Sequence, residues 1–265
     1  MARNLVLARC GKASLHEGWL AGAPHRNWDL ALAPYQEIAV TRAPEWMLPV
    51  VPGQKWAGLH KVLTEWPDWR AYDYIWLPDD DLAADALRVN TLFGLAEAFG
   101  AALAAPALSP DSYFSHYITM RNKSFFARAV SFVEVMMPCF RRDVLERMLP
   151  LLGEGAINDG WGLDFIWPKL LGYKDVYIFD CVTVKHTRAS TRTQAQAKPL
   201  MEAMHRLMAK YETQPVMKTI SCYKADGLVR YETPDIFLID YFHGYEYLYE
   251  TKPGMFSVIL QLQTS

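Results

Sequence analysis

The chain has 265 residues, of which 51% are hydrophobic and 13% aromatic. A composition this apolar supports a large buried core, which excludes a disordered chain and a small protein held together by disulfides. The 27 basic and 29 acidic residues leave a formal net charge of −2. A chain so close to neutral gives no overall electrostatic reason to expect nucleic-acid binding.

The N-terminal segment and the cysteines allow a prediction of the compartment in which the protein is found. The apolar run at 5–8 is too short for the core of a signal sequence, and the alanine-rich stretch at 91–108 is too polar to span a bilayer. The four cysteines are widely spaced and form no metal-binding pattern, so they are predicted to be buried, reduced thiols. We therefore expect a cytoplasmic protein without a transmembrane segment.

Strands and helices are predicted to alternate along the first 185 residues. Apolar and aromatic runs predict strands at 4–9, 28–35, 72–77, 101–105, 132–137 and 176–184. Apolar residues at helical spacing predict helices at 56–65, 85–99, 143–152, 164–171 and 195–211. Asp85 is the expected N-cap of the second helix and Gly100 its stop. This alternation favours an α/β fold with a mostly parallel central sheet flanked by helices.

The last fifty residues have a different composition, rich in tyrosine and phenylalanine, as in the run YFHGYEYLY at 241–249. They are expected to contain strand-like stretches. We expect one compact unit, with residues 1–190 as its core and residues 191–265 as a C-terminal helix and aromatic extension packed on it. The stretch 237–249 could also contact a membrane surface, but it lacks the basic face of a lipid-binding helix.

Three adjacent aspartates follow the predicted strand at 72–77, in the sequence YDYIWLPDDDL. A strand would deliver Asp79, Asp80 and Asp81 to its carboxyl end, where open α/β sheets bind ligands. The three carboxylates repel one another unless a cation lies among them, and Asp79 and Asp81 point the same way on an extended chain. Oxygen ligands suit Mg²⁺ or Mn²⁺. The alternative is an acidic loop that starts a helix.

A second polar segment, NDGWGLD at 158–164, lies between predicted elements. Its glycines permit tight turns that would expose Trp161, and an exposed indole offers a surface for a sugar ring. Asp164 opens the following helix, where it either acts as a general base in the adjoining pocket or is stabilised only by the helix dipole.

Three further residues are candidates for the same chemistry. His186 closes the apolar strand at 176–184 and could complete a metal shell with the aspartates, or be a surface group. Glu134 lies inside a predicted apolar strand, so it needs a partner such as a substrate hydroxyl or a cation. Lys55, at a glycine-bearing turn before a helix, could contact phosphate or simply solvent.

Several segments in this order resemble one family of sequences. They are YDYIWLPDDDL, ALAAPALSPDSYFSHY, FVEVMMPCFRRDVL and NDGWGLDFIWPKLLGY followed by VKHTR, which together span most of residues 50–190. The chain resembles an uncharacterised domain family of bacteria and plants whose members are regarded as glycosyltransferases. That family is in turn similar to the GT-A glycosyltransferases, which have a Rossmann-like sheet and an Asp-x-Asp motif that holds Mn²⁺ or Mg²⁺ against a nucleotide sugar.

The resemblance implies a metal site and a base. Asp79 and Asp81 would be metal ligands from the Asp-x-Asp motif, with Asp81 the more direct one, and His186 would match a histidine supplied by a later strand. The segment from Trp161 to Asp164 looks like the Trp-Gly-x-x-Asp region of inverting galactosyltransferases. There Trp161 and Gly162 would contact sugars and Asp164 would deprotonate the acceptor. This chain has one acid after Gly-Leu where that region has a pair, which leaves Asp159 as the alternative base.

The resemblance also implies how the donor and the acceptor bind. Arg9 and Tyr35, at the ends of the first two strands, would border the nucleotide base, while Lys55, Asp79 and Asp80 would lie near the diphosphate. Glu134 would bind a substrate hydroxyl. The expected reaction transfers a sugar from a nucleoside diphosphate to a hydroxyl of a glycan or glycoconjugate, as in polysaccharide biosynthesis, with inversion at the anomeric carbon.

Other classes share parts of this pattern. A nucleotidyltransferase acting on sugar phosphates would use the same sheet, metal and nucleotide but would release pyrophosphate. A non-catalytic carbohydrate-binding protein would account for the nine tryptophans without a reaction. Haloacid dehalogenase phosphatases also place Asp-x-Asp at a strand end, but on the first strand and with threonine or valine where this chain has Ala83.

Overall fold

A computed structural model describes residues 3–154, 159–190, 193–224, 230–231 and 234–264 of the chain. Its strands are β1 (Asn4–Cys10), β2 (Trp28–Pro34), β3 (Trp46–Met47), β4 (Tyr74–Trp76), β5 (Leu82–Ala83), β6 (Leu103–Leu108), β7 (Ala127–Val130), β8 (Cys139–Arg141), β9 (Val176–His186), β10 (Thr219–Tyr223) and β11 (Arg230–Tyr231). Its helices are α1 (His16–Trp19), α2 (Lys55–Glu65), η1 (Pro67–Ala71), α3 (Ala86–Ala98), η2 (Tyr117–Thr119), α4 (Arg142–Leu152), α5 (Leu163–Leu170), α6 (Gln194–Lys210), α7 (Pro234–His243), α8 (Glu246–Thr251) and α9 (Met255–Thr264).

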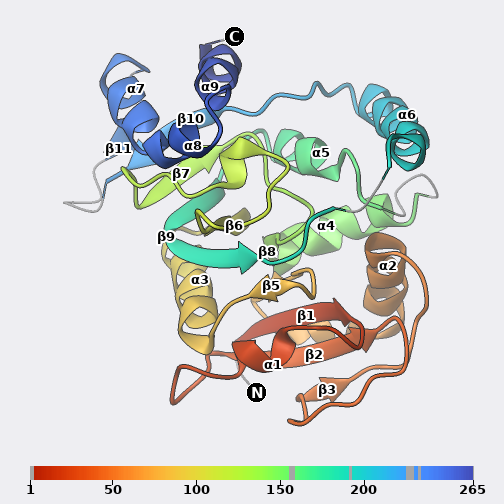
Figure 1. Cartoon of the computed structure of the whole chain (residues 1–265). Helices are drawn as coiled ribbons and strands as arrows, with labels where there is room; N and C mark the ends of the chain where they lie inside the picture. The colour runs from red at the N-terminus through yellow and green to blue at the C-terminus, as the bar shows by residue number, and fades with distance from the viewer. Residues whose placement is uncertain (1–2, 155–158, 191–192, 225–229, 232–233, 265) are drawn as a thin grey trace.

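One central sheet runs through the molecule in the order β11-β10-β7-β9-β6-β8-β4-β1-β2-β3 (Figure 1). The strand pairings make β3, β2, β1, β4, β6, β9 and β10 run in one direction and β8, β7 and β11 in the other. Helices α2 and α4 pack against each other and on β1, β4 and β8, while α3 packs on β6 and β9. The predicted α/β fold with a mostly parallel sheet flanked by helices is confirmed.

Local signals explain why the elements end where they do. The side chain of Asp85 accepts a hydrogen bond from the backbone N–H of Arg88, which confirms Asp85 as the N-cap of α3. Just beyond that helix, Gly100 adopts a positive φ of 60°, a conformation that glycine takes without strain. Strand β1 is buried along its whole length, as expected for a parallel strand covered on both faces.

The prediction of a strand at 132–137 is wrong. This apolar segment is a buried turn and loop, because other parts of the chain take its backbone groups. The ammonium of Lys55 donates to the carbonyls of Val135 and Met136, and the N–H of Asp79 also donates to Met136. Glu134 therefore lies in a loop, between β7 and β8, and not within a strand as predicted.

The prediction of strand-like stretches in the C-terminal segment is also wrong for the aromatic run at 241–249. Residues 241–249 belong mostly to α7 and α8, and Tyr241, Tyr245 and Leu248 are buried in the core. Figure 1 shows these helices beside β7 and β10, at the end of the molecule opposite β1–β3. In the described part of the chain, no helix has the length and apolar character needed to cross a membrane.

The cysteines follow the prediction with one exception. All four are free thiols, and Cys10, Cys139 and Cys222 are buried as expected. Cys181, in the middle of β9, is exposed instead. Its neighbour Asp180 points to the other face of the sheet, because side chains alternate along a strand.

A fully buried ion pair attaches the C-terminal helices to the sheet. The guanidinium of Arg128 in β7 lies 2.8 and 2.9 Å from the two carboxylate oxygens of Asp180 in β9, and both side chains have no exposed surface. Arg128 also donates to the Tyr245 hydroxyl and to the carbonyls of Ile118 and Met120. These bonds compensate the cost of removing both charges from water.

Removing one member of this pair should destabilise the protein strongly. We expect Asp180→Ala to lower the free energy of unfolding by about 3–5 kcal/mol, because it leaves a buried guanidinium without its counter-charge. Urea denaturation measures the change. The control is Glu146→Ala, which breaks the exposed pair between Arg70 and Glu146 and should cost less than about 1 kcal/mol. Equal effects of the two substitutions would contradict this role.

Candidate functional site

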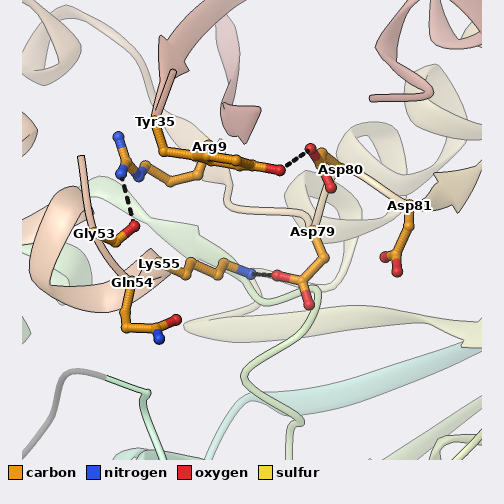
Figure 2. Close-up of a pocket in the computed structure, with 8 residues that line it drawn as sticks. All are labelled: Arg9, Tyr35, Gly53, Gln54, Lys55, Asp79, Asp80 and Asp81. Carbon is orange, nitrogen blue, oxygen red and sulfur yellow. Dashed lines mark hydrogen bonds and ion pairs between the residues drawn. The ribbon is translucent and has the colours of Figure 1, made fainter. Parts of the chain in front are cut away.

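The site lies where the strand order reverses. Strand β1 pairs with β2 on one side and with β4 on the other, all in parallel. In such sheets a crevice opens at the carboxyl ends of the two strands that flank the reversal. A cavity of about 390 Å³ occupies this place, which is within the range of ligand pockets. Its lining, shown in Figure 2, consists of Arg9, Tyr35, Gly53, Gln54, Lys55, Asp79, Asp80 and Asp81.

Asp79 is paired with a lysine. Its Oδ1 lies 2.6 Å from the Lys55 Nζ at the start of α2. Figure 2 shows the two side chains pointing toward each other. The same ammonium reaches the carbonyls of Val135 and Met136 at 2.9 Å each. Lys55 therefore has three acceptors and holds α2, the end of β4 and the 131–138 loop together. Asp79 as a metal ligand stays a prediction, since in this structure its carboxylate faces an ammonium.

Asp80 connects the exits of three strands. Its Oδ2 accepts hydrogen bonds from the backbone N–H of Gly11, after β1, at 2.8 Å and from the Tyr35 hydroxyl, after β2, at 3.1 Å. Its other oxygen lies 3.7 Å from the guanidinium of Arg188, beyond β9. The hydroxyl of Tyr35 occupies the space where a Cβ at position 11 would lie. This close approach requires glycine at position 11.

Asp81 faces the histidine predicted to share its metal. The Oδ2 of Asp81 lies 3.4 Å from the His186 Nε2, at the end of β9. Strand β5, which follows the aspartates, pairs antiparallel with the end of β9 and brings the two residues together. The hydrogen bond with Asp81 raises the pKa of His186. Burial alone would raise the pKa of Asp81, but His186 lowers it below its ordinary value.

The pair formed by Asp81 and His186 has features that fit a divalent cation. The Nδ1 of His186 lies 2.9 Å from the carbonyl oxygen of Tyr113. A carbonyl can only accept, so Nδ1 carries a proton and Nε2 is left to face Asp81. The other oxygen of Asp81, Oδ1, is buried, and no described residue forms a hydrogen bond with it. A neutral imidazole nitrogen and a carboxylate at this distance require a proton or a cation between them.

The side chains described here do not form a complete metal shell. Within the described residues, no group of three or more His, Cys, Asp or Glu side chains is placed to hold a metal ion. Asp81 and His186 would therefore be two ligands of an ion whose remaining positions are filled by other oxygen atoms. Ions such as Mg²⁺ commonly keep water or take substrate phosphate oxygens in this way.

Arg9 lines the cavity from the end of β1. It is only 3% exposed, and its guanidinium donates to the backbone carbonyls of Ala33, Pro34, Val51 and Gly53. No carboxylate pairs with it in the contacts that the structure describes. Its positive charge is therefore fixed at the wall of the cavity (Figure 2). Its carbon Cζ also lies 5.9 Å from the centre of the Tyr35 ring.

The predicted base, Asp164, lies in the first turn of α5 and is 6% exposed. Its Oδ1 is buried and finds no hydrogen-bond partner within the described residues. Burial raises the pKa of Asp164 to about 7, against the effect of backbone N–H groups that favour the charged form. A carboxyl with a pKa near neutrality is suited to accept a proton. It does not line the cavity beside the aspartates.

The segment before Asp164 turns tightly, as its glycines predict. Gly160 and Gly162 have φ values of 82° and 97°. A Cβ at position 160 would collide with the ring of Trp56, so glycine is required there. The sequence predicts an exposed Trp161, but this side chain is half-buried. Asp159 is also half-buried. Asn158 lies outside the described residues.

Glu134 is the other acid near this segment. The residue is half-buried, but its Oε2 is buried and has no hydrogen-bond partner in the described part of the chain. Burial, followed by the negative charge of Asp164, raises the pKa of Glu134 to about 8. The charges of His186, Asp79 and Lys55 also affect its pKa.

Some contacts that shape the site were not predicted from the sequence. The N–H of Gly11 and the side chain of Thr187, which donates to the backbone carbonyl of Asp81, position the acidic residues, and the carbonyl of Tyr113 positions His186. Of these groups, only Gly11 had a signal in the sequence, because it lies in the break predicted after the first strand. Backbone groups of loops leave no other pattern in a sequence.

Comparisons with other proteins complete this description. No family model matches the chain, and no curated protein matches it. Among solved structures it is similar to a glucosyl-3-phosphoglycerate synthase from Mycobacterium tuberculosis in complex with Mn²⁺, UDP-glucose and phosphoglyceric acid, with 14% identity over 80% of each chain and a TM-score of 0.47. A mycobacterial protein gives 12% identity over 85% of this chain and 80% of that one, with a TM-score of 0.49.

A third similar structure is the 1–349 segment of S. aureus TarS in complex with UDP, with 7% identity and a TM-score of 0.44. The match covers 78% of this chain and 65% of that one, so this chain spans slightly less than two thirds of it. These three similarities lie below a TM-score of 0.5. At this level of similarity they carry no evidence about the function of this chain.

The position of Lys55 can be tested by stability. We expect Lys55→Met to lower the free energy of unfolding by about 1–3 kcal/mol, because two carbonyls and a carboxylate lose their donor. The matched control is Lys61→Met on the same helix, whose ammonium is 3.9 Å from Glu65 on the surface and which should change stability by less than about 0.5 kcal/mol. Chemical denaturation of both variants makes the comparison, and equal values would contradict the described role of Lys55.

Proposed function

We propose that this chain is a metal-dependent glycosyltransferase that moves a sugar from a nucleoside diphosphate donor to a hydroxyl of a glycan or glycoconjugate. The observation that carries the proposal is the pair of Asp81 and His186, with its unpartnered oxygen, at the cavity where the strand order reverses. An incomplete shell of this kind leaves positions open for diphosphate oxygens.

The donor would lie across the cavity. Arg9 and Tyr35, at the exits of β1 and β2, would border the nucleotide base, and Lys55, Asp79 and Asp80 would lie toward the diphosphate. When bound, Mn²⁺ or Mg²⁺ would neutralise the charge that develops on the leaving diphosphate. Arg188, beside Asp80, adds a second positive charge at the same end of the cavity.

The acceptor would bind on the side of α5. Trp161 and Gly162 would contact sugar, and Glu134 would hold a substrate hydroxyl. Asp164 would take the proton of the attacking hydroxyl, whose oxygen forms the new bond to the anomeric carbon as the bond to the diphosphate breaks. Attack from the face opposite the leaving group inverts the configuration. Residues 1–190 would form this catalytic core, and residues 191–265 would extend it.

The metal-dependent binding of a nucleotide can be measured directly. We expect a nucleoside diphosphate to raise the melting temperature of the wild-type protein, and more so with Mn²⁺. At a ligand concentration of 100 Kd the gain is about 2.7 kcal/mol. Asp81→Ala should lose the part that depends on Mn²⁺, whereas Asp68→Ala, an exposed aspartate at the start of η1, should retain it. An unchanged Mn²⁺ effect in Asp81→Ala would contradict the metal role.

Replacing the base tests the chemical step. Asp164→Asn should lower transfer by about 10²–10⁴-fold, since an amide cannot accept the proton, while nucleotide binding with Mn²⁺ is retained. Asp159→Asn is the matched comparison and should keep most of the activity. If the losses are reversed, Asp159 is the base instead.

The products distinguish the competing classes. Release of a nucleoside diphosphate and a product of inverted anomeric configuration, seen by NMR, is expected. Release of pyrophosphate from a nucleoside triphosphate would identify a nucleotidyltransferase. Binding of glycan without metal and without turnover of any nucleotide sugar would identify a carbohydrate-binding protein.

A further inference from the structure

Two segments far apart in sequence are fixed side by side in this site. The backbone N–H of Val133 donates to the carbonyl of Asp164 at 3.4 Å. Beside this bond, the rings of Phe132 and Phe165 pack edge to face, with their centres 5.0 Å apart. Because the contacts involve the neighbours of Glu134 and Asp164 themselves, the two carboxyls belong to one local structure.

Glu134 is also tied to the cavity on its other side. The next two residues, Val135 and Met136, direct their carbonyls to the ammonium of Lys55, which pairs with Asp79. The glutamate therefore lies in a short span anchored at one end to Asp164 and at the other to the donor cavity. In the proposed reaction this span connects the donor cavity with the base.

Both acids have a free oxygen that water does not reach. Glu134 Oε2 and Asp164 Oδ1 are buried and have no hydrogen-bond partner among the described residues. An orphaned carboxyl oxygen inside a protein is costly unless a ligand completes it or the group stays protonated. Two such oxygens in neighbouring acids cannot both be charged without repulsion.

Glu134 and Asp164 differ in the charged and polar groups that affect them. Glu134 is faced by Asp164 from α5, Asp79 from the end of β4, Lys55 from α2 and His186 from β9, and the first of these has the largest effect after burial. Asp164 is favoured in its charged form only by backbone N–H groups at the start of α5, those of Gly162, Asp164 and Phe165. These backbone N–H groups therefore stabilise the ionised form of Asp164.

We propose that Glu134 and Asp164 act as one carboxyl pair that carries a single proton, which Glu134 keeps and donates as a hydrogen bond to an acceptor oxygen while Asp164 takes the proton of the attacking hydroxyl. The inference rests on the proposed function for its catalytic part. In the transfer step the hydroxyl proton moves to Asp164, the acceptor oxygen bonds to the anomeric carbon, and the diphosphate leaves with the electron pair. Asp164 then loses its proton to water.

The first arm of the test needs no substrate. Carboxyl ¹³C NMR of the metal-free protein follows the titration of both acids in the wild type, Glu134→Gln and Asp164→Asn. We expect the pKa of Glu134 to move down from about 8 in Asp164→Asn, because in the wild type Glu134 loses its proton beside an ionised Asp164. The pKa of Asp164 should stay at about 7 in Glu134→Gln, because Asp164 ionises while Glu134 is still protonated. Glu65→Gln, exposed on α2, should change neither titration. An unmoved titration of Glu134 in Asp164→Asn would overturn the pairing.

The second arm uses the pH dependence of transfer. The wild type should have a bell-shaped profile, rising as Asp164 ionises and falling as Glu134 does. Glu134→Gln keeps an N–H donor, so its transfer should fall less than that of Glu134→Ala, and its profile should lose the alkaline fall. Glu134→Ala should be low at every pH, by about 10²-fold or more. An unchanged profile in Glu134→Gln, or equal losses in Gln and Ala, would overturn the role of Glu134 as donor.

The two arms separate this inference from the proposed function. If no nucleotide sugar is turned over by the wild type but the NMR titrations are coupled, the pair stands and the transferase fails. If Glu134→Gln does not fold, the titration of Glu134 in Asp164→Asn still decides the pairing. If transfer occurs with uncoupled titrations, the transferase stands and the pair fails.

Discussion

Three carboxylates in consecutive positions after β4 impose the arrangement of this site. They repel one another, so each must be compensated by a different group, and the structure takes those groups from different parts of the chain. Asp79 meets Lys55 from α2, Asp80 meets Gly11 and Tyr35 at the ends of β1 and β2, and Asp81 meets His186 from β9. The repulsion is local in sequence, while its compensation requires the whole sheet to be formed.

The same principle acts at the opposite end of the sheet with a different outcome. Arg128 and Asp180 lie on neighbouring strands, have no exposure and are satisfied by further hydrogen bonds, including one from Arg128 to Tyr245 in the C-terminal segment. That network is closed, because every charge has its partner. At the site, in contrast, Asp81, Glu134 and Asp164 each have a buried oxygen without a hydrogen-bond partner among the described residues. A ligand can therefore supply missing hydrogen bonds at the site, but not at the pair of Arg128 and Asp180.

How far the sequence predicts this structure depends on the range of the contacts. Periodicity and caps act over a few residues, so α3 with its cap Asp85 and the buried strand β1 are predicted well. The 132–137 segment shows where this fails: its apolar residues resemble a strand, yet Lys55, some eighty positions away, takes its carbonyls. The sequence shows that Asp81 and His186 suit a cation, but the distance between them is a property of β5 and β9 pairing.

That same loop joins the two halves of the proposed site. Its carbonyls are held by the lysine that faces Asp79, and its Val133 is bonded to the backbone of Asp164. Because these anchors lie within a few residues of each other, the loop fixes the spacing between the cavity and Asp164. In the proposed reaction, the spacing between the donor and the base is therefore set by a segment with no regular secondary structure.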